Sequence, residues 1–150
     1  MTHEFEDDAA IADLVRGFLA CDLPKARWTH AAHFAAALWL LRHDPQPPLT
    51  RRMPGLIRAY NESVGGVNSD TEGYHETITQ ASLRAAAAVL VACTAASVRD
   101  ALDRLMTGPA GRSDWLLTYW SRERLFSVEA RRGWVEPDVA PLPFPPLAEG

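Results

Sequence analysis

The feature that most constrains this chain is a run of small apolar residues at 85–96, AAAAVLVACTAA, which continues a helical pattern that starts near residue 74. Alanine is the strongest helix former, and a helix without a polar face is typical of one surrounded by other helices. The run is shorter than the roughly 20 apolar residues that span a bilayer. We therefore expect a long helix over 74–96 that packs centrally among others and spans no membrane.

Helical spacing of apolar residues recurs along most of the chain, and no segment shows the alternation of a strand. The expected helices cover residues 7–20, 30–43, from 50–54 to about 64, 74–96, 97–106, 114–120 and 122–132. Thr29, Ser97, Ser113 and Ser121 stand where N-caps are expected, and Ser69 with Glu72 has the spacing of a capping box for the long helix. The sequence predicts an all-α, single-domain bundle of about six to seven helices.

Residues 135–150, VEPDVAPLPFPPLAEG, differ in composition from the rest, because their prolines exclude helix and favour an extended polyproline form. We expect a helical domain over 1–134 and an extended tail over 135–150. The apolar side chains of Val139, Leu142 and Phe144 favour docking of the tail on the chain's own domain. The alternative is that the tail binds in the groove of a partner.

The charge balance argues against nucleic acid as a partner. The chain has 15 basic and 19 acidic residues, a formal net charge of −4, so it lacks the basic surface of such binders. Its start, MTHEFEDD, has no basic and apolar leader segment, and its two cysteines form neither a CxxC pair nor a disulfide framework. We expect a cytoplasmic protein whose partner is a small-molecule substrate or ligand, with a homodimer as a further possibility and no contact with membranes.

Two histidines lie one helical turn apart in WTHAAHFAAALWLL. His30 and His33 should be neighbours on one helical face, which Phe34 and Ala37 share. This face points to the core, where burial and the positive end of the helix dipole both disfavour charged imidazoles. Neutral rings with a free lone pair are what a divalent metal requires.

The third candidate ligand is His75, in the segment GYHETIT at the start of the long helix. Steps of about 100° per residue place His75 on the same helical face as Thr79 and Ser82. Packing of the two helices with their N-terminal ends close would bring His30, His33 and His75 together as a three-histidine metal site with an open position. The alternative is that each histidine satisfies a polar spot in the core through ordinary hydrogen bonds.

Polar residues near these histidines complete the expected site. Glu76 projects about 100° away from His75, so we expect it to act as an orienting partner or base rather than as a ligand, with Tyr74 beside it. Binding contacts are expected from the side chains of Thr79, Ser82, Asn68 and Tyr60. A group of aromatic residues later in the chain is interpreted as core packing: Trp115, Tyr119, Trp120, Phe126 and Trp134.

Two functions follow from this pattern. The first is a metal-dependent enzyme in which His30, His33 and His75 hold a divalent ion, Zn, Fe, Mn or Ni, that activates water or a small polar substrate. The alternative is a non-enzymatic helical module that binds a small molecule or a protein partner and has structural histidines. An intermediate possibility is a pocket that uses the histidines without metal, as acid–base or ligand-orienting groups.

Overall fold

The computed structural model describes residues 4–147, which form seven α-helices and three short 3-10 helices without a strand among them. The α-helices are α1 (Asp8–Leu19), α2 (His30–His43), α3 (Leu49–Ser63), α4 (Glu76–Ala92), α5 (Val98–Thr107), α6 (Arg122–Leu125) and α7 (Val128–Arg132). The 3-10 helices are η1 (Lys25–Arg27), η2 (Pro109–Gly111) and η3 (Trp115–Thr118). The predicted all-α, single-domain class is confirmed.

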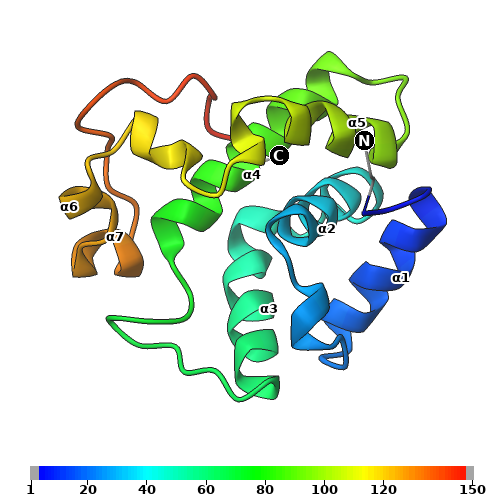
Figure 1. The fold of residues 1–150 in the computed structure, drawn as a ribbon, viewed down its shortest axis with the longest axis horizontal. Helices are drawn as coiled ribbons and strands as arrows, with labels where there is room; N and C mark the ends of the chain where they lie inside the picture. Colours follow the sequence, from blue (N-terminus) through cyan, green and yellow to red (C-terminus); the bar gives the residue numbers. More distant parts are fainter. Residues whose placement is uncertain (1–3, 148–150) are drawn as a thin grey trace.

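The central helix is α2, which packs against α1, α4 and α5 (Figure 1). Ala35, Ala36 and Leu38 in its middle are completely buried. The alanine-rich helix α4 also packs among other helices, as expected, because it contacts α2, α3, α5 and α7 and its residues Ala85 and Ala86 are buried. The helix ends at Ala92 and not at residue 96 as predicted, and its last turn lies at the surface, where Val91 is 79% exposed. Alanines make up much of the buried face of both helices, so α2 and α4 can approach each other closely.

Most of the predicted helix starts are confirmed by their caps. The side-chain oxygens of Thr29, Ser97 and Ser121 accept hydrogen bonds from backbone N–H groups of the first turns of α2, α5 and α6. Ser113 caps no helix, because η3 begins at Trp115 without a side-chain cap. The segment expected as one helix over 122–132 is divided into α6 and α7, since Ser127 caps a new start there.

The loop before α4 places His75 just outside the helix. Ser69 and Glu72 bond to each other within this loop, through the Ser69 N–H to the Glu72 carbonyl at 2.9 Å, so they close a turn and do not cap α4. Gly73 has a φ of +84°, and a Cβ there would lie 2.2 Å from the carbonyl oxygen of Val67. The chain therefore enters α4 in an extended form, with His75 as the N-cap.

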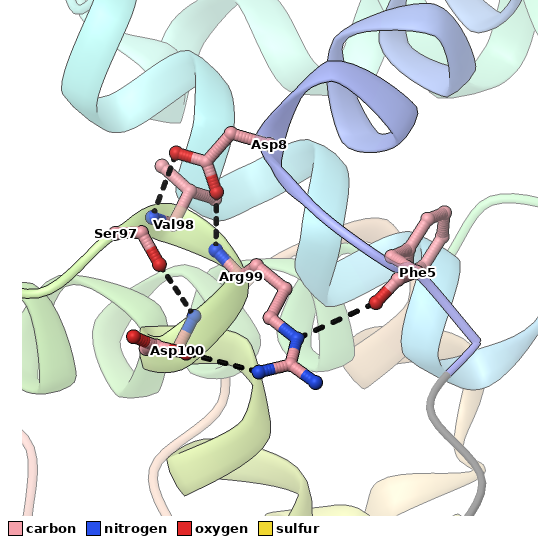
Figure 2. A network of polar contacts seen from close by, with 6 residues as sticks. All are labelled: Phe5, Asp8, Ser97, Val98, Arg99 and Asp100. Carbon is pink, nitrogen blue, oxygen red and sulfur yellow. Dashed lines mark hydrogen bonds and ion pairs between the residues drawn. The ribbon is translucent and has the colours of Figure 1, made fainter.

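The carboxylate of Asp8 joins the first turns of two helices, α1 and α5 (Figure 2). It accepts hydrogen bonds from the backbone N–H groups of Val98 at 3.1 Å and Arg99 at 2.8 Å. These N–H groups open α5 and have no partner within the helix, and the helix dipole favours an anion at this position. Asp8 therefore fastens the start of α1 to the start of α5.

The proline-rich segment runs over the outside of the helices (Figure 1). Leu142 and Phe144 are partly buried against the core, with the Phe144 ring centre 6.2 Å from that of Trp115. Val139 is 60% exposed, although its N–H donates to the Tyr119 carbonyl at 2.9 Å. Residues 148–150 of the expected tail lie outside the described residues.

Candidate functional site

A hollow of about 460 Å³ lies between α2, α3, α4 and residues 113–126; we call it the central pocket. Its floor consists of buried apolar side chains, and its rim consists of exposed side chains of mixed character, which include His33 although its helical face was expected to point to the core. The floor includes Phe34, Ala37, Met53, Leu83 and Trp115, whereas the rim includes Ser113, Asp114, Arg122 and Phe126. An apolar floor with a mixed rim suits a small molecule that has one apolar end.

His30 and His33 both line the central pocket, together with Phe34 and Ala37 from the same face of α2. The Nε2 of His30 donates to the Ala110 carbonyl at 2.7 Å, and the Nδ1 of His33 donates to the Thr29 carbonyl at 2.7 Å. A carbonyl oxygen can only accept, so each of these nitrogens carries the proton. In the neutral ring, the other nitrogen then has a free lone pair.

His33 lies at the exposed rim of the pocket, and its surroundings favour the neutral form of its ring. Burial lowers the pKa of His33, the hydrogen bond to the Thr29 carbonyl opposes this change, and the neighbouring His30 lowers the pKa further. The ring of Trp28 covers that of His33, with ring centres 4.1 Å apart. His33 is therefore a hydrogen-bond acceptor at neutral pH, and its orientation is determined by neighbours on two sides.

Thr79 and Ser82 line the same pocket from α4, as the helical spacing predicts. The Thr79 hydroxyl donates to the His75 carbonyl at 2.8 Å, which leaves its oxygen able to accept. Four of the nine predicted site residues are thus brought together: His30, His33, Thr79 and Ser82.

His75 does not join the other two histidines as a free ligand. Its Nδ1 accepts the N–H of Ile78 at 3.1 Å, and its Nε2 donates to the Leu125 carbonyl at 2.7 Å. Both ring nitrogens are therefore engaged by backbone. Burial lowers the pKa of His75, which keeps the ring in this neutral form.

The expected three-histidine arrangement is accordingly not formed. Between residues 4 and 147, no group of three or more His, Cys, Asp or Glu side chains is arranged to hold a metal ion. The error has a local cause. His75 has extended backbone angles, φ −134° and ψ 111°, so the helical step of about 100° does not apply to it.

Tyr74 and Glu76 pair with each other away from the central pocket. The Tyr74 hydroxyl donates to Glu76 Oε1, and Glu76 lines a second hollow beside Gln80 and Arg84. Burial, followed by the hydrogen bond to Glu76, raises the pKa of Tyr74 well above its usual range. Neither residue is placed to act on a molecule in the central pocket.

Tyr60 and Asn68 have structural partners instead of a place in the pocket. The buried Tyr60 hydroxyl donates to the Leu23 carbonyl at 2.8 Å. The Asn68 Oδ1 accepts from the Asn61 amide at 3.1 Å and from the Tyr74 N–H at 3.0 Å. Asn68 thereby holds the loop that leads to His75.

Sequence reasoning missed several pocket residues. Trp28 directly precedes the Thr29 cap, and its ring is stacked on Phe18 at 4.4 Å between ring centres. Its Nε1–H is the one buried side-chain polar atom without a partner among residues 4–147. Phe126, expected in the core, is 49% exposed and lines the pocket, whereas Trp115 is buried as predicted. Arg122 could not be recognised as a pocket residue from the sequence, because only the tertiary fold brings α6 to this pocket.

Comparisons with protein-family models, with curated proteins and with solved structures found no match for the chain. Within residues 4–147, no helix combines the length and the apolar character that crossing a bilayer requires. The candidate function therefore depends on the geometry of the central pocket.

Proposed function

We propose that this chain binds a small, largely apolar molecule in the central pocket, oriented by His30 and His33. The observation that carries the proposal is the pocket itself. Its volume of about 460 Å³ falls within the range of about 300–1,000 Å³ that is usual for small-molecule sites. Such sites combine apolar walls with a few polar groups in fixed positions.

The two imidazoles provide the fixed polar groups. In each ring, one nitrogen is held by a backbone carbonyl, so the tautomer and the orientation of the ring are set before a ligand arrives. The remaining nitrogens accept hydrogen bonds. They would recognise a hydroxyl or an amide N–H on a molecule whose remaining surface is apolar.

A catalytic use of the same histidines is the second candidate. Burial lowers the pKa of His33, and a neutral imidazole can take a proton from a bound hydroxyl as a general base. The metal-dependent form of this activity has less support, because both ring nitrogens of His75 are engaged by backbone.

The test is a fluorescence titration with 2-naphthol, an apolar probe that carries one hydroxyl. We expect saturable binding of one molecule per chain, with quenching of Trp28 and Trp115, which line the pocket. Ser82→Phe should fill the pocket and abolish binding, whereas Ser82→Ala, the control at the same position, should retain it. Ile57→Trp is a second blocking variant from α3.

Circular dichroism establishes that each variant is folded. Absence of saturable binding to the wild-type chain would overturn the proposal. Equal binding by a folded Ser82→Phe or Ile57→Trp variant would do so as well, because the probe would then occupy another site.

A further inference from the structure

One charged group at the rim of the central pocket lacks a partner of opposite charge. Arg122 lines the pocket from α6, and its side chain is exposed. Its guanidinium lies 5.8 Å from the ring centre of Phe126, and no carboxylate or carbonyl in the described part of the chain pairs with it. Its hydrogen-bond donors are therefore available to a molecule at the rim.

The other arginines of α6 and α7 are used differently. Arg124, Arg131 and Arg132 each donate to a carbonyl or carboxylate of another segment. These contacts fasten the two short helices to the rest of the domain. Arg122 differs from its neighbours because it lines a hollow and makes no such contact.

The second charged group at the rim is Asp114. Its carboxylate lies 3.4 Å from the Nε of Arg112, so its charge is already partly balanced. The charge at the rim that remains unbalanced is thus the positive one of Arg122. A planar guanidinium matches the geometry of a carboxylate and can bind both of its oxygens.

We infer that the molecule bound in the central pocket is an amphipathic carboxylic acid, with its carboxylate on Arg122 and its apolar body on the floor of the pocket. This inference rests on the proposed function and adds the chemical class of the ligand. His33 favours the same orientation, because its pKa is lowered and the lone pair of its neutral ring repels an anion but accepts from a hydroxyl. The carboxylate is therefore directed to the rim.

The test compares 2-naphthoate with its neutral ester methyl 2-naphthoate, which offers the histidines no hydrogen-bond donor, near pH 7, where the acid is ionised. We expect the wild-type chain to bind the carboxylate about fivefold more tightly, a preference weakened by added salt. Arg122→Gln should remove this preference. Arg16→Gln, which makes the same change in charge on the exposed face of α1, should retain it.

Equal affinity of the wild-type chain for both probes would overturn the inference, as would a preference that persists in Arg122→Gln. The 2-naphthol titration separates this failure from failure of the proposed function. If 2-naphthol binds in the pocket and 2-naphthoate binds no more tightly than its neutral counterpart, the carboxylate assignment is refuted and the proposed function is not. If the folded Ser82→Phe variant binds 2-naphthol and 2-naphthoate as tightly as the wild-type chain does, both proposals are refuted.

Discussion

The Nε2–H of His75 donates a hydrogen bond of 2.7 Å to the backbone carbonyl of Leu125. His75 precedes α4 and Leu125 ends α6, so this imidazole joins the start of a long helix to the segment that lines the central pocket. Its Nδ1 accepts from the Ile78 N–H on the other side. The ring of His75 therefore links two segments of the fold, and both of its nitrogens form hydrogen bonds to backbone groups.

We expect the free energy of unfolding to fall as the pH decreases from about 7 to about 5. Burial lowers the pKa of His75 below its ordinary value of about 6.5, and that of His33 likewise. The unfolded chain therefore takes up these protons before the native chain does, and the loss of stability grows until the pH reaches the native pKa. Urea denaturation across this pH range measures the effect.

His75→Asn separates the contribution of this residue, because asparagine also caps helices but does not titrate in this range. The pH dependence should be smaller in His75→Asn than in the wild-type chain. Ser97→Asn, which exchanges the N-cap of α5 for asparagine without removing a titrating group, is the control and should retain the pH dependence of the wild type. The same pH dependence in His75→Asn and the wild type would contradict the prediction.

Gly73→Ala should destabilise the domain by about 2 kcal/mol or more. Gly73 has a φ of +84°, and the added Cβ would meet the Val67 carbonyl oxygen at 2.2 Å. Gly55→Ala is the control, since a Cβ there meets nothing within 4 Å. Gly55 lies inside α3, so this change should stabilise by about 0.5–1 kcal/mol. Denaturation midpoints measure both changes, and a Gly73→Ala variant as stable as the wild type would refute the loop geometry.

Asp8→Asn should cost about 1–2 kcal/mol of the free energy of unfolding. The substitution removes the negative charge at the start of α5 and weakens the hydrogen bonds from Val98 and Arg99 (Figure 2). Asp13→Asn removes the same charge from an exposed pair with Arg16, where ion pairs contribute about 0–1 kcal/mol. Equal effects of the two substitutions in chemical denaturation would show that the link between α1 and α5 contributes little.

We expect His75→Asn to leave the metal content of the purified protein and its thermal response to added zinc unchanged. The reason is that neither nitrogen of His75 has a free lone pair while the ring bonds to Ile78 and Leu125. Elemental analysis and thermal denaturation with and without zinc measure these quantities. A stoichiometric metal that is lost in both His30→Ala and His75→Asn would instead establish the three-histidine site.

The candidate site was predictable from the sequence where helical geometry applies. His30 and His33, one turn apart on α2, and Thr79 and Ser82 on α4 line one pocket, as their spacing indicates. The prediction failed for His75 because that residue lies one position before its helix, where the backbone is extended. It also failed for Phe126, since aromatic spacing does not distinguish the core from the rim of a pocket.

The sequence by itself determined the all-α class, the caps at Thr29, Ser97 and Ser121, and the shared face of His30 and His33, because these depend on contacts within a few residues. Only the tertiary structure decided which groups meet at the pocket. Arg122 and Trp28 reach the same hollow from distant segments. Such meetings depend on how side chains of different volume pack together, which the local pattern of a chain does not specify.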